Sequence, residues 1–297
     1  RHVPVGEGHA HRQPQPWKGF EEIGQLPGGV DREAWELARR NLGTLGGGNH
    51  FLELQGGDDG RVWLMVHSGS RNLGLKIANH YHRLAREICR RRKLELPDMD
   101  LACLPLDSEE GRAYLRDMEF ALRYARENRR RMAERFRDAL ARYVPDAEFE
   151  PDLDVHHNYA AAETHFGREV WVHRKGATAA RAEELGIIPG SMGTPSYIVR
   201  GLGHPDAFMS SSHGAGRRMG RAEACRRLSK EEADAAMQGI VFDGWKRLGG
   251  GRHRDLAGRY DLEEAPQAYK PIDEVMAAQA DLVQPLVRLR PLGVVKG

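Results

Sequence analysis

Residues 108–143 constrain the fold of this chain more than any other segment, because apolar side chains recur there at helical spacing. Positions three and four residues apart share one face of a helix, so one long helix or a helical hairpin is predicted. The opposite face is rich in arginine, and the apolar stripe indicates packing rather than a cofactor surface. The stripe consists of Leu115, Met118, Leu122, Ala125, Met132, Phe136, Leu140 and Tyr143.

The rest of the chain mixes helices with strands. Helices are predicted at 31–41, 75–93, 230–237 and 272–282, and a short one opening near Tyr159. Strands are predicted at 51–54, 61–66, 169–173, 197–199 and close to the C-terminus, and a Gly/Pro loop at 186–193. Strands and helices do not alternate as βαβ units. We therefore expect an α+β fold, with residues 1–297 forming a single large domain of mixed β-sheets layered with peripheral helices.

Composition excludes several classes of protein. No apolar run approaches the roughly 20 residues that a membrane span needs, and no signal peptide is visible. The three cysteines have no paired spacing, which favours a reducing cytoplasm over a disulfide framework. The net charge is only +2. Basic runs at 90–93 and 129–131 are typical of solvated helix faces, with contact to a nucleic-acid backbone as the alternative.

One histidine-centred segment, SSSHGAGR at 210–217, is the strongest candidate for chemistry. Its glycines let the backbone approach a ligand, and Arg217 offers donors suited to phosphate oxygens. His213 in such a loop can be a base, a metal ligand or a nucleophile. Because glycine and serine also mark ordinary turns, a solvated loop remains the alternative.

Three further histidines, His50, His67 and His157, lie in polar settings that suit a transition metal such as manganese. A hairpin at 51–66 would bring His50 and His67 close together, although strand parity places His50 and Glu53 on opposite faces. The loops GGGN, SGSR, RKGA, PGSMG and GAGR have the character of anion sites, without a P-loop or a dinucleotide fingerprint. These features indicate metal-assisted phosphate chemistry; hydrogen-bonded loop histidines are the alternative. The remaining candidates are interpreted as structural: His156, His165 and His173.

Seven segments resemble the RtcB family of RNA-splicing ligases, in the same order, from about Leu42 to Gly297. They are LGTLGGGNHFLEL, VHSGSRNLG, HHNY, RKGA, IIPGSMGTPSYIVRGLG, SSSHGAGR and the terminal VVKG. The resemblance implies an RtcB-like fold and a ligase that joins RNA 3′-phosphate or 2′,3′-cyclic phosphate ends to 5′-hydroxyl ends. It implies GTP and Mn²⁺, two ions in the complete protein, as cofactors. His213 would attack the α-phosphate of GTP, and the guanylate would pass to the RNA 3′-phosphate before the 5′-hydroxyl displaces GMP.

The resemblance also implies roles for individual residues. His50, His67 and His157 match metal ligands, and Arg71 and Arg217 lie where phosphate or RNA would bind. The positions that match nucleotide contacts are Asn49, Phe51, Glu53, Asn158, Pro189, Gly190, Ser191, Met192, Ser196, Ala215, Gly216 and Lys296.

The chain departs from the family pattern in one respect. The family's D-x-x-C-G motif, whose Asp and Cys complete a two-manganese site, does not occur in this sequence. Truncation ahead of Arg1 is the favoured explanation, and loss of a metal site in this form is the alternative. A metal-dependent RNA phosphoesterase and a non-catalytic RNA-binding remnant are the alternatives to a ligase. The expected setting is tRNA splicing or RNA repair in the cytoplasm, away from membranes, with an archease-type activator as a partner.

Overall fold

The computed structural model describes residues 3–150, 152–249 and 254–297 and confirms the α+β class. Backbone contacts divide the chain into two compact units, which we describe separately. The helical unit comprises Arg1–His50, Val66–Asp146 and Gly297, and the sheet unit comprises Phe51–Met65 and Ala147–Lys296. That residues 1–297 form one domain stays a prediction.

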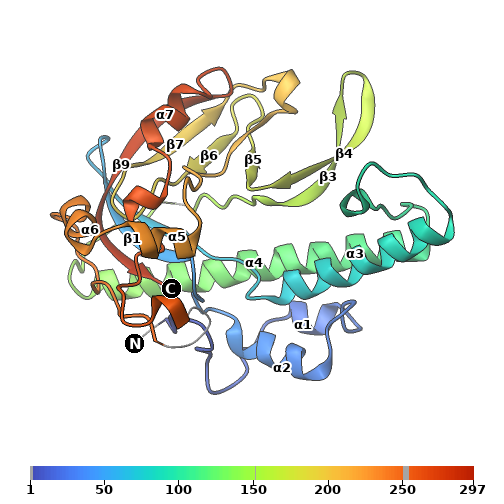
Figure 1. Cartoon of the computed structure of the whole chain (residues 1–297), viewed down its shortest axis with the longest axis horizontal. Coiled ribbons are helices and arrows are strands. Elements are labelled where there is room, and N and C mark those ends of the chain that lie inside the picture. The colour runs from blue at the N-terminus through green and yellow to red at the C-terminus, as the bar shows by residue number, and fades with distance from the viewer. Residues whose placement is uncertain (1–2, 151, 250–253) are drawn as a thin grey trace. The chain divides into compact units, whose positions relative to one another are not determined.

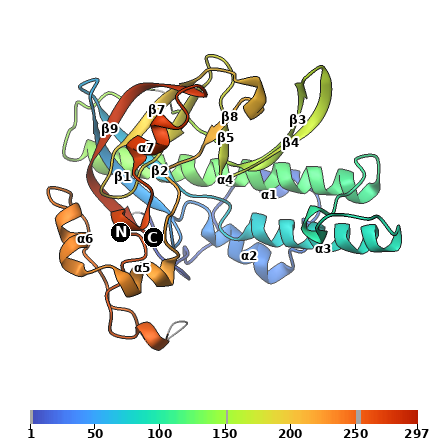
Figure 2. The same cartoon turned by 45° about the horizontal axis from the view of Figure 1, so that its top comes forward.

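The helical unit is built on two long helices that lie side by side in Figures 1 and 2. These are α3 (Leu73–Arg91) and α4 (Glu109–Ala141). The predicted segment at 108–143 is therefore one helix of 33 residues and not a hairpin. Ser108 caps its N-terminus, because its hydroxyl accepts a hydrogen bond from the Gly111 amide at 3.0 Å. The shorter elements are α1 (Gly19–Glu22), α2 (Arg32–Asn41) and the 3-10 helix η1 (Met99–Leu101).

An aromatic cluster forms the core of the helical unit. Tyr124 of α4 is fully buried, and its hydroxyl donates to the Ala38 carbonyl of α2 at 2.7 Å. Phe120, one turn earlier on α4, stacks on Trp35 at a ring-centroid distance of 5.6 Å. Of the predicted apolar stripe, Ala125 and Met132 are buried, whereas Tyr143 is 85% exposed. Phe120 and Tyr124, the aromatic core residues of α4, are not among its predicted members. The buried members of this core are Val30, Ala38, Leu42, Leu73, Ile77, Tyr81, Phe120 and Tyr124.

The sheet unit is organised around a five-stranded sheet in the order β2-β1-β9-β7-β6. The central β9 (Val283–Lys296) pairs antiparallel with both β1 (Phe51–Gly57) and β7 (Ser196–Gly201). Proline cannot donate to a ladder and is confined in sheets to edges and bulges. Accordingly, Pro285 and Pro291 both lie at register shifts of β9. The other two strands are β2 (Val62–His67), which crosses the unit boundary, and β6 (Leu185–Ile188).

Two short ribbons complete the sheet unit, and both views show the first projecting from the five-stranded sheet. It pairs β3 (Asn158–His165) with β4 (Arg168–Lys175) at all eight positions. The short helix predicted near Tyr159 is therefore wrong, because this pairing fixes an extended backbone. The second ribbon pairs β5 (Ala177–Ala179) with β8 (Ser210–Ser212).

Short helices border these strands. In α6 (Lys230–Ala236), Ser229 and Glu232 form a capping box at the N-terminus. In contrast, α7 (Ile272–Ala277) ends well before the predicted residue 282. Its buried Ile272 and Met276 pack in one cluster with apolar residues of the sheet. The remaining elements are α5 (Arg221–Arg227), η2 (Pro205–Ala207), η3 (Arg254–Leu256) and η4 (Pro266–Ala268).

Candidate active site

His213 follows β8 directly and is held by a backbone carbonyl. Its Nδ1 lies 2.6 Å from the oxygen of Gly176, which follows β4. Since a carbonyl only accepts, Nδ1 carries the proton and the neutral ring presents a lone pair at Nε2. Gly176 has φ +65°, and a Cβ there would lie 3.2 Å from Cε1 of His213. Glycine therefore fits both the backbone conformation and the close approach of the ring.

His157 stacks on His213. The ring centroids are 4.9 Å apart and the planes differ by 8°. The Gly176 amide donates to the His157 carbonyl at 2.8 Å, so one glycine contacts both histidines through its backbone. Two members of the predicted constellation are thus neighbours within the sheet unit.

The surroundings of His213 favour the neutral form of its imidazole. Burial lowers its pKa from the usual value, and the charge of Lys175 acts in the same direction, although the Gly176 carbonyl opposes both. A neutral imidazole is the nucleophilic form, because the protonated ring has no free lone pair. The site therefore favours the reactive state at neutral pH.

The loop around His213 is fixed on both sides. Ahead of it, the Ser212 amide donates to Oε1 of Gln279 at 3.0 Å. Behind it, the Ala215 amide donates to the Pro189 carbonyl at 3.0 Å. This contact joins two of the predicted nucleotide positions, and Gly216 follows with φ +72°. The turn is consequently a defined structure rather than a loose solvated loop.

Arg217 is engaged by the protein itself. Its guanidinium bonds Glu264 at 3.0 Å and also donates to the hydroxyl of Tyr269 and to a backbone carbonyl. The same buried Glu264 pairs with Nζ of Lys296 at 2.9 Å. Burial opposes ionisation of Glu264, but Lys296, Tyr269 and Arg217 together lower its pKa. In this structure Arg217 braces the loop, and its contact with phosphate or RNA stays a prediction.

Several predicted nucleotide contacts meet at the ends of β1 and β9. Nζ of Lys296 lies 5.2 Å from the ring centroid of Phe51, its partner in the strand pair. Glu53 is 2% exposed, and burial raises its pKa to about 8 although Lys296 and Gln55 act to lower it. Nε2 of Gln55 bridges Glu53 at 2.5 Å and Ser196 at 3.1 Å.

The hydroxyl of Ser196 also reaches the Pro-Gly loop. It accepts a hydrogen bond from the Gly190 amide at 3.2 Å. Next in that loop, the Ser191 amide donates a hydrogen bond to the Thr194 hydroxyl at 2.7 Å. The side chain of Met192 is buried in the core. A ligand would therefore meet the backbone of Met192 rather than its side chain. The predicted loop at 186–193 is wrong in its first part, because residues 185–188 form β6.

The helical unit brings together the other two histidines. The rings of His50 and His67 lie 5.9 Å apart between centroids. Within the described residues, no group of three or more His, Cys, Asp and Glu side chains lies close enough to hold a metal ion. The pair therefore supplies two imidazoles but not a complete ligand set. A metal site that also includes His157 stays a prediction, since His157 belongs to the sheet unit.

Asn128 of α4 organises the two loops that carry these histidines. Its Oδ1 accepts from the amides of Gly43 and Thr44 at 2.6 and 3.1 Å. Its Nδ2 donates to the Thr44 carbonyl, the Ser68 hydroxyl and the Gly69 carbonyl at 3.1–3.2 Å. The side-chain amide of Asn128 thus forms hydrogen bonds with backbone groups of both glycine-containing loops.

Arg71 lies in the second of these loops with φ +51°. Its Nε donates to Thr44 at 3.0 Å, and burial lowers its pKa. The guanidinium packs against Gly46, where a Cβ would overlap it at 1.8 Å. Asn49 is exposed in the helical unit, and Asn158 is exposed at the start of β3. No contact of the described residues tests the predicted ligand roles of these three.

Sequence reasoning missed four buried polar residues that shape the site: Gln55, Asn128, Glu264 and Gln279. Gln55 had a usable signal, because it lies two positions after Glu53 and so shares its face of the strand. The other three lie far along the chain from the residues they hold. Nothing in their local sequence distinguishes them.

These observations define an α+β protein in which a histidine, hydrogen-bonded through Nδ1 to a backbone carbonyl, lies among glycine- and serine-containing loops. The sequence matches the profile of the family described as tRNA-splicing ligase RtcB over residues 9–297. The chain therefore belongs to the RtcB family.

Curated relatives agree with this assignment. The RNA-splicing ligase RtcB of Escherichia coli (strain K12) is 40% identical over 264 residues, which cover 87% of this chain and 62% of that protein. The RNA-splicing ligase RtcB of Mycobacterium tuberculosis is 40% identical, covering 90% and 67%. The tRNA-splicing ligase RtcB of Archaeoglobus fulgidus is 36% identical, covering 94% and 65%. The chain thus spans a little under two thirds of the Escherichia coli relative.

Helices that could cross a membrane are absent from the described part of the chain. None is both long enough and apolar enough.

Proposed function

We propose that this chain carries the catalytic histidine of a GTP-dependent RNA ligase, which joins RNA 3′-phosphate or 2′,3′-cyclic phosphate ends to 5′-hydroxyl ends. The observation that carries the proposal is the hydrogen bond from Nδ1 of His213 to the Gly176 carbonyl. It assigns the lone pair to Nε2, the atom that would attack phosphorus. The relatives named as RNA-splicing and tRNA-splicing ligases support this reaction class.

The first step would form a covalent guanylate. Nε2 of His213 attacks the α-phosphorus of GTP, a P–N bond forms, and the P–O bond to the β-phosphate breaks with loss of pyrophosphate. The ring gains positive charge during the attack. The Gly176 carbonyl lies where it can stabilise that charge through the Nδ1 proton. The RNA 3′-phosphate then takes the guanylate, and the 5′-hydroxyl displaces GMP.

Guanine recognition is proposed at the cluster of Phe51, Glu53 and Lys296. A carboxylate accepts from the two N–H groups on one edge of guanine, and an ammonium donates to its O6. Glu53 and Lys296 offer these complementary groups, and their mutual electrostatic interaction indicates that they lie near each other. The proposal thus distinguishes guanine from adenine by the direction of its hydrogen bonds.

Manganese is the proposed metal, with His50, His67 and His157 among its ligands. When bound, such an ion would neutralise phosphate charge at the site. The two imidazoles of the helical unit alone are fewer ligands than manganese prefers, so the site needs further donors. We further propose a cytoplasmic location, which the free thiols of Cys89, Cys103 and Cys225 support. An archease-type activator remains a proposed partner.

The test is covalent labelling of the complete gene product with GTP radiolabelled at the α-phosphate, in the presence of Mn²⁺. We expect a label that His213→Ala abolishes and that the control His173→Ala, at an exposed position of β4, retains. A phosphoramidate is labile in acid and stable in alkali, so the label should follow that pattern. This property distinguishes His213 from the serines that precede it.

Joining is tested with an RNA that bears a 3′-phosphate and a second RNA that bears a 5′-hydroxyl. A product of summed length in the presence of GTP supports the ligase. Release of inorganic phosphate without joining would instead indicate a phosphoesterase. Binding of RNA with neither outcome would indicate a non-catalytic protein.

A further inference from the structure

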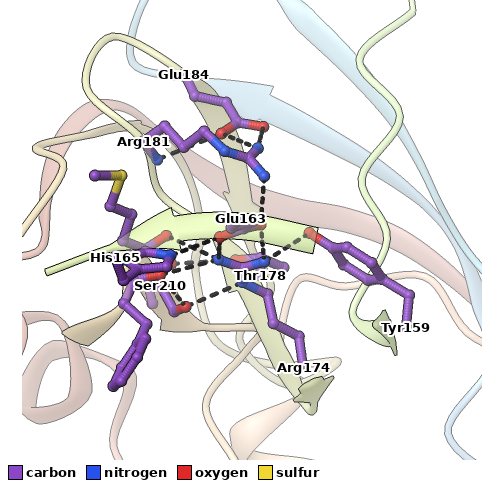
Figure 3. A network of polar contacts seen from close by, with 11 residues as sticks. Tyr159, Glu163, His165, Arg174, Thr178, Arg181, Glu184 and Ser210 are labelled. Atoms are coloured by element: carbon purple, nitrogen blue, oxygen red, sulfur yellow. Dashed lines mark hydrogen bonds and ion pairs between the residues drawn. The ribbon is translucent and has the colours of Figure 1, made fainter. Parts of the chain in front are cut away.

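We propose that Arg174 is a positioning residue that sets His213 in its reactive orientation. The inference rests on the proposed function of His213 as a nucleophile, but its structural part can be tested without any activity. The network that carries it joins β3, β4 and the strand ahead of His213 and is drawn in Figure 3.

Arg174 is a buried cation, and all three nitrogens of its guanidinium donate hydrogen bonds. The residue is 2% exposed. Nη1 and Nη2 bond the two carboxylate oxygens of Glu163 at 2.6 and 3.0 Å. Nε donates to the Ser210 hydroxyl at 3.0 Å, and Nη2 also donates to the Phe208 carbonyl at 3.0 Å. Nη1 reaches the hydroxyl of Tyr159 at 3.3 Å.

These contacts hold the two chain segments on which Gly176 and the candidate nucleophile, His213, lie. Arg174 lies two residues before Gly176, whose carbonyl holds Nδ1 of His213. Ser210 lies three residues before His213 and opens β8. One guanidinium therefore fixes the two backbone segments whose spacing determines the hydrogen bond to His213. The pairing of Ala177 with Ser212 transmits this spacing to the histidine.

Glu163 keeps the guanidinium in place. Besides Arg174, its carboxylate accepts from Arg181 at 2.6 Å and contacts Nε2 of His165 at 2.9 Å. The hydrogen bond from Arg174 is the largest cause that lowers the pKa of Glu163 to about 2. The carboxylate is therefore a permanent charge under physiological conditions.

The shape of arginine matters here as well as its charge. A lysine could pair with Glu163, but its single ammonium cannot also reach a hydroxyl and a carbonyl on the opposite side. Arg174→Lys should therefore retain much of the ion pair and lose the link to β8. This substitution separates a positioning role from a contribution to stability alone.

Arg181 offers a matched control. It bonds the same Glu163 and also Glu184, but its side chain is 44% exposed and its hydrogen bonds include none to β8 or to Phe208. Arg181→Ala removes one cation from the network and leaves the hydrogen bonds from Arg174 to Ser210 and Phe208 intact. Ser210→Ala is the complementary variant, because it removes the acceptor of Arg174 Nε, together with the hydrogen bond from the Ser210 hydroxyl to the Phe208 carbonyl, and leaves Arg174 itself in place.

The experiment combines two readouts on the complete gene product. Nitrogen-15 NMR of labelled histidine reports which ring nitrogen of His213 carries the proton, without nucleotide or metal. The rate of guanylylation at saturating GTP and the KM for GTP report the chemistry. In Arg174→Lys we expect a mixture of tautomers and a rate lowered about 10- to 100-fold with KM little changed, because a small misplacement of a reacting group slows the step that much.

Ser210→Ala should change both readouts in the same direction but less, and Arg181→Ala should match the wild type. A wild-type tautomer and rate in Arg174→Lys would overturn the proposal, as would an equal loss in Arg181→Ala. If the wild type itself takes no guanylate, the proposed function fails. The tautomer measurement then still decides whether Arg174 positions His213.

Discussion

A buried carboxyl is the residue-scale feature with the clearest functional consequence. Glu53 lies at 2% exposure next to Gln55, and burial raises its pKa to about 8. At neutral pH the group is therefore mostly protonated in the unliganded protein. In the proposed site guanine would need it as an acceptor, so binding would be coupled to the ionisation of Glu53.

We predict that GTP affinity rises with pH. Between pH 7 and pH 8 the ionised fraction of a group with pKa near 8 increases about fivefold, and affinity should follow. Titration calorimetry across this range measures the effect. Glu53→Gln should bind GTP weakly with no such pH dependence. An affinity that is flat with pH in the wild type would contradict the assigned role.

Glu264 is the second residue whose loss should be severe. Its buried carboxylate forms ion pairs with Arg217 and Lys296 and accepts a hydrogen bond from the hydroxyl of Tyr269. Glu264→Gln removes the counter-charge that Arg217 and Lys296 share, so we predict a loss of about 3–5 kcal/mol in the free energy of unfolding. Urea denaturation measures it. The adjacent control Glu263→Gln should change little, because Glu263 holds Arg217 through its backbone carbonyl.

At the scale of elements, α4 contributes more than its apolar stripe. The sequence predicts part of the buried face, including Ala125 and Met132, because helical spacing is local, but it leaves out Phe120 and Tyr124. It could not predict that Asn128, between core positions, would reach residues more than 80 positions earlier in the chain. Helix α4 is thus also the support for the loops of His50 and His67.

Replacing Asn128 tests this support. Asn128→Ala leaves the amide of Gly43 and the carbonyl of Gly69 without this partner, while the Thr44 amide keeps the Asn41 carbonyl, so the protein should be destabilised by about 2–5 kcal/mol. Thermal unfolding followed by circular dichroism measures the change. Glu119→Ala, at an exposed position of the same helix, is the control and should stay within about 0.5 kcal/mol. Equal stability of the two variants would show that the loops do not depend on Asn128.

The strand β3 shows where local sequence misleads. Its three consecutive alanines have high helix propensity, and this favours the wrong prediction. The eight cross-strand pairs with β4 override that propensity. The early end of α7 has a similar origin. Its last turn gives way to a segment in which Gln279 is buried and bonded to Ser212.

At the scale of the whole molecule, Glu163 should govern part of the response to acid. Its folded pKa of about 2 lies below the ordinary 4.5, chiefly through Arg174. Its stabilisation is therefore complete above about pH 4.5 and is lost as the pH falls toward 2. We predict that roughly 3 kcal/mol disappears across this window.

Denaturant unfolding at several pH values between 7 and 2 checks this prediction. Glu163→Gln should be less stable than the wild type at pH 7, and the two should converge as the pH approaches 2. A constant difference between them across this range would exclude Glu163 as the responsible group.

The sequence predicts the α+β class, the family and the pairing of His50 with His67, because these depend on motifs and on a local hairpin. It also selects His213 as the candidate nucleophile from the segment around it, and that role stays a prediction. It does not predict that Arg217 and Arg174 are neutralised by Glu264 and Glu163. Those partners are fixed only when distant strands and loops pack, so no local pattern records them.

The position of β9 at the centre of its sheet has a consequence for synthesis. Strand β1 leaves the ribosome more than 200 residues before β9, the strand with which it pairs. At typical rates of translation this delay lasts roughly 10–50 s. During that time Phe51 and Leu52, which are buried in the finished protein, have no β9 to pair with. The nascent chain should therefore be a client of ribosome-associated chaperones until β9 emerges.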